Sequence, residues 1–257
     1  MQPISAVIIT KNEQAIIAKT ILAVKHICAE VLVADTGSTD ETAAIASKLG
    51  ARVITLPWQG FGATKNAALA AATYNWVLAL DADETPDVLL QQSIAQLSLT
   101  HTQEIYLLRY KNFIGNKEVK YGEWKPPVKA RLFNKTFTQW QPVPIHEGVL
   151  RPPGHIEKIL DGFLLHTSVA NMQEYLSKQL AYAELMAQQY ANKGKNSSAF
   201  KRYIYPTLAF WQTYLLKGGF LDGRVGFMAA QVQRFYVFYK YWRLYELNAS
   251  KNTTTAP

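Results

Sequence analysis

The sequence has one cysteine, few charged residues and no long apolar run. A single cysteine, Cys28, excludes an intrachain disulfide and a cysteine-based zinc cluster. It follows a helical pattern, and we expect it to be a small buried hydrophobic residue rather than a reactive thiol. Nowhere do about 18 uncharged apolar residues follow one another, so no membrane-spanning helix is expected. The segment 1–5 lacks the basic and apolar regions of a secretory signal, which favours a cytoplasmic protein.

The composition is that of a globular protein with an excess of basic side chains. Of 257 residues, 49% are hydrophobic and 18% are charged, which excludes disordered, collagen-like and disulfide-scaffold proteins. This length suits one larger α/β domain or a domain with an appendage. The 27 Lys and Arg against 19 Asp and Glu give a net charge of +8. Residues 199–251 contain eight basic and two acidic side chains, so the rest of the chain is nearly neutral.

Up to about residue 110, short β-rich apolar runs alternate with helical patterns. We expect strands at 4–9, 30–34, 52–54 and 76–80, and helices at 15–27, 38–49 and 63–72. Ser38 and Glu41 have the spacing of a capping box at the start of the second helix. The alternation predicts an α/β protein with a doubly wound, mostly parallel sheet and helices on both faces. Ligands of such sheets bind beyond the carboxyl ends of the strands.

The pattern changes beyond residue 110. Residues 111–168 are rich in Pro, Trp and Gly, which is typical of a long functional connection with short strands such as 130–133. Helices are expected at 169–192, 199–217 and 222–247, before a polar tail at 248–257 that should be frayed. We therefore expect one domain over residues 1–168, with halves 1–110 and 111–168, followed by a helical C-terminal region at 169–247.

The C-terminal stretch 199–251 is also aromatic, with 15 of the 31 aromatic residues of the chain. One interpretation is a helical hairpin that packs on the sheet domain, with Lys and Arg snorkelling on its outer face. The other is an interfacial element on an anionic membrane, where Trp and Tyr favour the headgroup level. The aromatic residues fall nearly all round an ideal helix, so the pattern leaves both open. Nucleic acid is not expected as a partner, because no reader motif accompanies the charge.

Two carboxylates, Asp81 and Asp83, directly follow the buried strand pattern 76–80. Residues at i and i+2 of an extended chain point to the same side, so both can face one cation. Hard ions such as Mg²⁺ and Mn²⁺ prefer oxygen ligands and commonly join protein carboxylates to a diphosphate. The alternative is a solvated acidic loop before a helix near Pro86, where negative charge is favourable.

Three more polar segments occupy comparable positions along the chain. They are Thr10-Lys11-Asn12-Glu13, Asp35-Thr36-Gly37-Ser38-Thr39-Asp40 and Gly60-Phe61-Gly62-Ala63-Thr64-Lys65-Asn66. Lys65 suits a phosphate as a point charge. Each segment also has a structural interpretation: caps at Asn12 and Ser38, an Asx-turn at Asp35 and a surface charge at Lys65. All of them would meet Asp81 and Asp83 at one edge of the sheet, which favours a common site.

These residues carry a resemblance to a known family. Thr10-x-Asn12-Glu13, Asp35-x-Gly37-Ser38-Thr39-Asp40, Lys65-Asn66 and Asp81-x-Asp83 resemble the motifs of family 2 glycosyltransferases of the GT-A fold, over residues 4 to about 110. Arg131-Leu132-Phe133, His146-Glu147 and the segment 217–223 resemble, more narrowly, the bacterial lipopolysaccharide inner-core β-1,4-glucosyltransferases. Many family members have Arg-Asn where this chain has Lys65-Asn66, which keeps the charge and removes the bidentate fork.

The resemblance implies a nucleotide-sugar donor and a divalent metal, Mg²⁺ or Mn²⁺. It implies Glu13 and Asp35 near the uridine, with Asp81 and Asp83 at the ribose, metal and diphosphate. It also supports His166, at the end of the apolar run 162–165, as the third metal ligand; otherwise a lone histidine there is structural. The expected donor-binding residues are Thr10, Asn12, Glu13, Asp35, Ser38, Asp40, Lys65, Asn66, Asp81 and Asp83.

Family 2 enzymes invert the anomeric centre, which requires a base for the acceptor hydroxyl. We prefer Glu147, which resembles the family's placement, and keep Glu123 and Glu84 as alternatives. The expected reaction moves a hexose, glucose from UDP-glucose, to heptose of the lipopolysaccharide inner core, by a protein peripheral at the inner face of the bacterial inner membrane. The alternatives are a polyprenyl phosphate or capsule acceptor, or a non-catalytic basic protein that binds lipid or nucleic acid.

Overall fold

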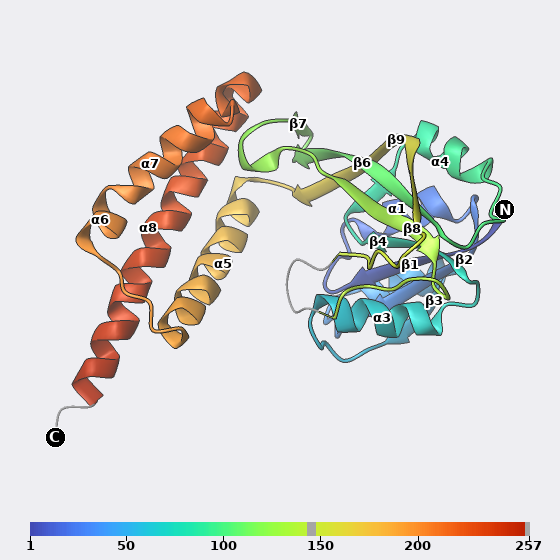
Figure 1. The fold of residues 1–257 in the computed structure, drawn as a ribbon, viewed down its shortest axis with the longest axis horizontal. Coiled ribbons are helices and arrows are strands. Elements are labelled where there is room, and N and C mark those ends of the chain that lie inside the picture. The colour runs from blue at the N-terminus through green and yellow to red at the C-terminus, as the bar shows by residue number, and fades with distance from the viewer. Residues whose placement is uncertain (143–147, 255–257) are drawn as a thin grey trace. The chain divides into compact units, whose positions relative to one another are not determined.

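The computed structural model describes residues 1–142 and 148–254, and the chain divides into two compact units. Unit 1 consists of Met1–Lys111 and Pro127–His166, and unit 2 of Asn112–Pro126 and Thr167–Pro257. Most of the sheet seen in Figure 1 belongs to unit 1, and the long C-terminal helices belong to unit 2. The boundary that the sequence predicts at residue 168 stays a prediction.

Four parallel strands form the first half of the sheet of unit 1. In spatial order they are β3 (Arg52–Thr55), β2 (Cys28–Asp35), β1 (Gln2–Thr10) and β4 (Trp76–Asp81). Thr10 pairs with Asp35 and Ile9 with Asp81, so the carboxyl ends of three strands lie level with one another. The polar segments that follow these strands therefore begin at the same edge.

The other half of the sheet is antiparallel. β8 (Val128–Asn134) pairs with β4, and the path continues through β6 (Glu104–Ile114), β9 (Ile156–Val169) and β5 (Glu84–Pro86). Strands thus fill much of the 111–168 region, where the sequence suggested an irregular connection. The pairing of β5 with β9 sets Glu84 opposite His166, although the two are far apart in sequence. The sheet is therefore mixed, and the predicted α/β class of the GT-A kind is confirmed.

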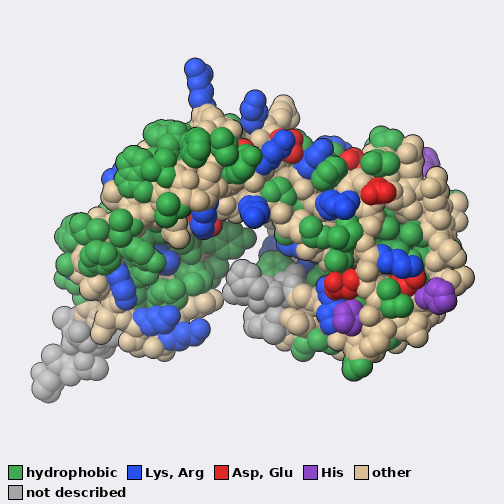
Figure 2. Space-filling model, turned by 45° about the horizontal axis from the view of Figure 1, so that its top comes forward, with side chains coloured by type: hydrophobic (Ala, Val, Ile, Leu, Met, Phe, Trp, Pro, Cys, Tyr) green, Lys and Arg blue, Asp and Glu red, His purple; other side chains and the backbone are tan. Residues whose placement is uncertain are grey.

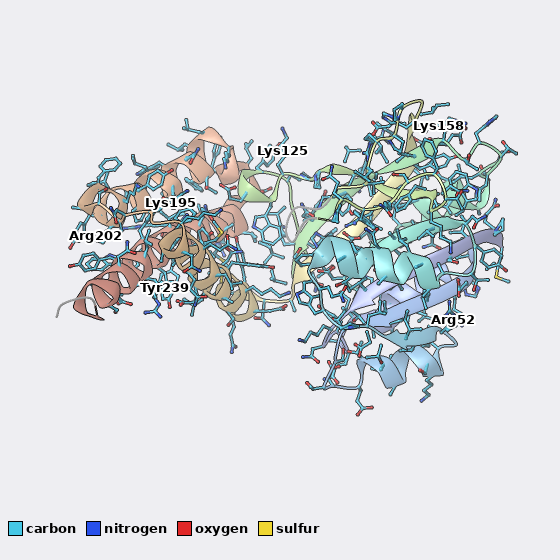
Figure 3. All side chains as sticks on the ribbon, turned by 60° about the horizontal axis from the view of Figure 1, so that its bottom comes forward. Arg52, Lys125, Lys158, Lys195, Arg202 and Tyr239 are labelled. Atoms are coloured by element: carbon cyan, nitrogen blue, oxygen red, sulfur yellow. The ribbon has the colours of Figure 1, made fainter. Side chains whose placement is uncertain are left out.

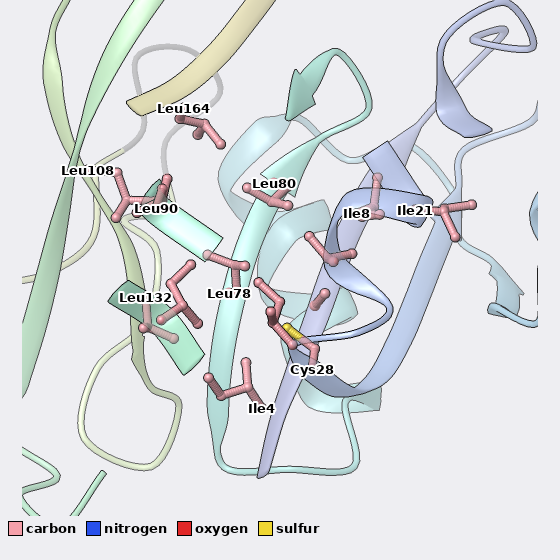
Figure 4. Close-up of a cluster of buried hydrophobic side chains, with 14 of the residues drawn as sticks. Ile4, Ile8, Ile21, Cys28, Leu78, Leu80, Leu90, Leu108, Leu132 and Leu164 are labelled. Atoms are coloured by element: carbon pink, nitrogen blue, oxygen red, sulfur yellow. The ribbon is translucent and has the colours of Figure 1, made fainter. Parts of the chain in front are cut away.

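Helices cover both faces of this sheet. Alternate residues of β1 face two separate cores: Ile4 and Ile8 join one cluster, and Val7 joins the other. α1 (Ile17–Val24) and α4 (Val88–Ala95) contribute to the first, and α3 (Phe61–Ala71) to the second. Figure 4 shows the first cluster.

The start of α2 (Thr42–Lys48) differs from the prediction. Glu41 is the N-cap residue and makes no capping hydrogen bond through its side chain. Ser38 instead donates its hydroxyl to Asp35, so the predicted capping box is wrong. The reason is tertiary: the Ser38 hydroxyl accepts from the backbone N–H of Asn12, 26 residues away, which holds the serine in the loop before the helix.

Cys28 is the first residue of β2, after the predicted helix 15–27, and its predicted burial is confirmed. It is 2% exposed among Ile4 and Leu78 (Figure 4). Burial raises the pKa of its thiol to about 12. We therefore expect no reaction with a thiol reagent at about pH 8 in the native protein, because the thiolate is the reactive form. A spectrophotometric thiol assay should detect the thiol only after denaturant is added; fast labelling of the native protein would contradict the burial.

Unit 2 is mainly helical. Besides β7 (Lys117–Val119), it contains η1 (Gly122–Trp124), α5 (Met172–Asn192), α6 (Ala199–Tyr203), α7 (Tyr205–Trp211), the π-helical η2 (Gln212–Leu216), η3 (Gly219–Asp222) and α8 (Gly223–Thr254). Small side chains of α5 and α7, such as Ala187 and Ala209, pack against Val237 and Leu244 of α8. In the part of the chain that the structure describes, no helix is long and apolar enough to cross a membrane.

The last helix is longer than the sequence suggested. α8 continues to Thr254, through most of the segment 248–257 predicted to be frayed. The polar side chains there find partners: Asn248 donates to the carbonyl oxygen of Lys195 at 2.9 Å, and Ser250 donates to that of Glu246 at 3.0 Å. These contacts extend the helix beyond its apolar stretch.

Candidate active site

The predicted donor residues of the first two loops form one hydrogen-bonded network at the sheet edge. The backbone N–H of Asn12 donates to the Ser38 hydroxyl at 2.9 Å, and Ser38 in turn donates to the Asp35 carboxylate. The backbone N–H of Thr39 donates to Asn12 Oδ1 at 2.8 Å. Asn12 has a φ of 55°, in the left-handed region that asparagine tolerates better than most residues. The two loops are thereby held together before any ligand binds.

Thr10 and Glu13 flank this network on the first loop. Thr10 is 3% exposed, and its hydroxyl has no hydrogen-bond partner among the residues that the structure describes. The backbone N–H of Glu13 donates to Thr42 at 2.8 Å, which joins the first loop to α2. Hydrogen bonds from Thr42 lower the pKa of Asp40, because they stabilise the carboxylate form. In the structure Asp40 thus shapes the entry to α2, and its role in donor binding stays a prediction.

Asp81 is held between two cations. Its Oδ1 lies 3.2 Å from Lys65 Nζ, and its Oδ2 lies 3.1 Å from Arg131 Nη2. The Arg131 side chain is 4% exposed and also contacts Glu84 Oε1 at 2.6 Å. Glu84 accepts a second hydrogen bond from the Tyr110 hydroxyl at 2.9 Å. Two carboxylates and two cations are therefore interleaved at the end of β4.

These surroundings shift the pKa values of Asp81 and Glu84 in opposite directions. Burial alone raises the pKa of Asp81, but Lys65 and Arg131 outweigh it and hold the pKa well below its usual range. Burial also raises the pKa of Glu84, and there the opposing charge of Arg131 does not compensate. Since Asp81 repels a second negative charge beside it, the pair favours an ionised Asp81 and a Glu84 that holds its proton more tightly than usual.

Acid should weaken this cluster. Because the pKa of Asp81 is lower in the folded than in the unfolded chain, its carboxylate stabilises the fold above about pH 4, its unfolded pKa. That contribution is lost as the pH falls below about 4 toward the folded pKa. We expect the difference in unfolding free energy between wild type and Asp81→Asn, measured with urea, to shrink from pH 6 to pH 3. A difference that grows on acidification would contradict the ion pairs.

Asp83 and His166 form a second pair next to this cluster. His166 Nε2 lies 3.3 Å from Asp83 Oδ2, and both side chains are partly exposed. Burial lowers the pKa of His166, but the hydrogen bond and charge of Asp83, with Glu84 and Asp81, outweigh it and raise the pKa. Within the described ranges, no three His, Cys, Asp or Glu side chains gather closely enough to hold a metal ion alone. A carboxylate oxygen and an imidazole nitrogen nevertheless fit two ligands of a cation whose other ligands come from a diphosphate.

Lys65 and Asn66 have different surroundings. Lys65 is 5% exposed, and its Nζ lies 4.6 Å from the ring centroid of Trp140, so it is not a surface charge. The Asn66 amide accepts from the backbone N–H of Trp140 at 2.9 Å and donates to its carbonyl oxygen at 3.0 Å. Asn66 therefore holds Trp140 against the lysine. Nothing in the local pattern around Trp140 singles it out.

The three base candidates are placed differently. Glu147 lies outside the residues that the structure describes. Glu84 is 1% exposed and paired with Arg131. Glu123 belongs to unit 2, where its carboxylate contacts Lys217 at 2.6 Å and accepts from Thr213 at 3.1 Å. The structure thus gives structural partners to Glu84 and Glu123.

Known proteins are similar to this chain over its whole length. An uncharacterized glycosyltransferase of Rickettsia typhi is 32% identical, covering 100% of this chain and 91% of the relative. A lipopolysaccharide core biosynthesis glycosyltransferase, LpsC of Rhizobium meliloti, is 30% identical, covering 97% of this chain and 94% of LpsC.

A solved structure and a family model also match. Glucosyl-3-phosphoglycerate synthase of Mycobacterium tuberculosis, crystallised with Mn²⁺, UDP and glucosyl-3-phosphoglycerate, is 28% identical over 45% of each chain, with a TM-score of 0.35. The family model described as glycosyl transferase family 2 matches residues 5–158, which include the strand ends and the Asp81, Asp83 and Glu84 cluster. The chain is an enzyme that belongs to glycosyltransferase family 2.

Proposed function

We propose that the protein transfers a hexose, glucose from UDP-glucose, to heptose of the lipopolysaccharide inner core with inversion of the anomeric centre. The observation that carries this proposal is the edge of the sheet where Asp81, between Lys65 and Arg131, adjoins the Asp83–His166 pair. The similarity to LpsC along nearly the whole chain supports the lipopolysaccharide core as acceptor. A polyprenyl phosphate or capsule acceptor is the alternative, because it would use the same donor residues.

The donor would lie along the carboxyl edge of the parallel strands. Glu13 and Asp35 are the proposed uridine contacts, and the network that joins Asn12 to Ser38 holds both loops in place for them. The unpartnered Thr10 hydroxyl is available to a ligand atom there. Lys65 and Arg131 supply two buried positive charges near the expected diphosphate, where charge interactions are stronger than in water.

A divalent cation, Mg²⁺ or Mn²⁺, fits this donor set. Asp83 and His166 would hold it together with Asp81, and the imidazole suits Mn²⁺ better than Mg²⁺. Such an ion neutralises the negative charge that develops on a departing diphosphate. Lys65 and Arg131 meanwhile keep Asp81 ionised, which preserves its carboxylate for the site.

The transfer is a single displacement. The acceptor hydroxyl oxygen forms a bond to the anomeric carbon while the bond from that carbon to the UDP oxygen breaks, and the electron pair of that bond leaves with UDP. The hydroxyl proton passes to a carboxylate, for which we propose Glu147. Glu84 suits a positioning role through Arg131, since its Oε1 contacts Arg131 and Tyr110 and its Oε2 accepts from the backbone N–H of Asp81.

We also propose that the protein works as a peripheral protein at the inner face of the bacterial inner membrane. An acceptor in the lipopolysaccharide core precursor is embedded in a bilayer, so the enzyme must meet a membrane surface. The basic and aromatic helices of unit 2 suit an anionic surface of this kind.

The experiment is UDP release from a panel of UDP-sugars with Mg²⁺ or Mn²⁺, with and without a heptose-terminated core acceptor. We expect release from UDP-glucose that depends on the acceptor. Release from another UDP-sugar would overturn the donor, and release with only a polyprenyl phosphate would overturn the acceptor. Absence of release from every sugar by the folded protein would overturn the proposed reaction.

A further inference from the structure

The whole net charge of the protein lies in unit 2. Counted along the sequence, unit 1 contains 13 Lys and Arg and 13 Asp and Glu, whereas unit 2 contains 14 basic and 6 acidic side chains. Each acidic side chain of unit 2 has a partner within the unit: Glu118 with Lys120, Glu123 with Lys217, Glu174 with Lys178, Glu184 and Glu246 with Arg243, and Asp222 with the backbone N–H of Tyr121. The remaining basic side chains give unit 2 an uncompensated positive charge.

Two arginines line a groove of about 360 Å³ between α6, α7 and α8. Arg202 and Arg234 form its cationic walls, and neither has a carboxylate partner among the described residues. Figure 3 labels Arg202 among the helices of unit 2. The Arg202 guanidinium lies 4.3 Å from the ring centroid of Tyr245, and its Nε is buried with no hydrogen-bond partner in the described part of the chain. The other lining residues are Tyr203, Pro206, Thr207, Gln231, Phe235 and Phe238.

A second groove, of about 420 Å³, lies between α5 and α8 and is almost entirely apolar. Gln231 and Phe235 line both grooves, so the cationic groove and the apolar groove share a wall. Leu176 and Leu180 on α5 line this groove, and their side chains are 36% and 39% exposed. Figure 2 shows hydrophobic side chains, with Lys and Arg among them, covering the helices of unit 2. Large exposed apolar areas of this kind mark binding surfaces.

We propose that the two grooves together bind one anionic phospholipid of the bilayer. The phosphate of its headgroup lies between Arg202 and Arg234, and its acyl chain lies along the α5–α8 groove. Guanidinium groups bind phosphate through paired hydrogen bonds, and arginine loses less freedom than lysine in doing so. A free phosphate would leave the adjoining apolar groove empty, whereas the acyl chain of a lipid would fill it, so a lipid fits both grooves better. This inference rests on the proposed membrane association and is independent of the sugar-transfer reaction.

Vesicle sedimentation with the full chain tests the headgroup site. We expect binding to vesicles of phosphatidylcholine and phosphatidylglycerol that falls at least about 20-fold in Arg202→Gln/Arg234→Gln, since each basic side chain near an anionic surface contributes about fivefold. The matched control, Lys117→Gln/Lys193→Gln, removes the same charge from exposed positions of unit 2 outside both grooves and should lose less than about threefold. Equal losses in both variants would overturn the site and leave a general attraction of unit 2 for anionic membranes.

A second pair of variants tests the acyl groove. Leu180→Asn should weaken binding to the same vesicles, whereas Leu185→Asn, on the same helix and 53% exposed but outside the groove, should not. Glycerol phosphate added to the sedimentation assay should displace little protein from the vesicles. Displacement as effective as that by a soluble short-chain phosphatidylglycerol would show a free-phosphate site and overturn the proposal. UDP release with a soluble acceptor, measured on each variant, reports the transfer reaction separately. A wild type that releases UDP but binds no vesicles would overturn the membrane association together with this site.

Discussion

Asp83→Asn and Asp81→Ala are each expected to reduce turnover about a thousandfold or more, the largest effect that we predict for activity. A carboxylate that holds a divalent cation against a diphosphate contributes several kcal/mol to the transition state, and about 4 kcal/mol corresponds to a thousandfold in rate. Both side chains are partly exposed at the sheet edge rather than buried in a core, so the fold should survive. Initial rates of UDP release at saturating metal measure the loss.

Asp161→Asn provides the control for these variants. Asp161 belongs to the same unit, its side chain is 82% exposed, and its contact with Arg109 is a loose surface ion pair at 3.7 Å. It should retain wild-type turnover. If Asp83→Asn kept most of its turnover while its circular dichroism and unfolding midpoint matched wild type, the metal role of Asp83 would be wrong.

Glu84→Gln is expected to destabilise the fold by about 3 kcal/mol, the largest effect that we predict for stability. Glu84 is 1% exposed, and it neutralises the buried guanidinium of Arg131 together with Asp81. Removing one partner of a buried ion pair leaves an uncompensated charge in a low-dielectric environment, which typically costs about 3–5 kcal/mol. Urea unfolding followed by tryptophan fluorescence measures the change.

Two further variants test whether the destabilisation in Glu84→Gln comes from the unpaired buried charge rather than from the loss of a carboxylate as such. Glu157→Gln removes one partner of the Arg151–Glu157 pair, whose side chains are about a third exposed, and should change the unfolding free energy by less than about 1 kcal/mol. In Glu84→Gln/Arg131→Met, the destabilisation should be smaller than the sum of the single changes, because no unpaired charge remains. Simple additivity of the two would show that Glu84 and Arg131 are not coupled.

The strand ends were predictable because their signals are local. An apolar run followed by Asp81-x-Asp83, or by Asp35 and a turn, indicates a strand and its termination within a few residues. The parallel pairing then follows from the alternation of strands and helices, and it places Thr10, Asp35 and Asp81 at one edge. The family could be inferred from the same residues, since its motifs lie at these strand ends.

Arg131 and Trp140 were not predictable as parts of this cluster. Arg131 reaches Asp81 only because β8 runs antiparallel beside β4, and that pairing depends on contacts between segments about 50 residues apart. Trp140 reaches Lys65 through the Asn66 side chain, across 74 residues. No spacing within a strand or helix encodes either contact. The Ser38 prediction failed for the same reason, because a capping box considers only neighbours along the chain.

The amino-acid sequence alone was therefore enough to predict the α/β class, the positions of the parallel strands, the chemistry of their carboxyl ends and the family. These properties depend on hydrophobic periodicity and on residues close together along the chain. Three features of the site depend on how the chain folds in space: the cations around Asp81, the burial of Glu84 against Arg131, and the contact of His166 with Asp83. Such contacts join distant segments, and their energies depend on burial and on the distance between charges, which no local pattern contains.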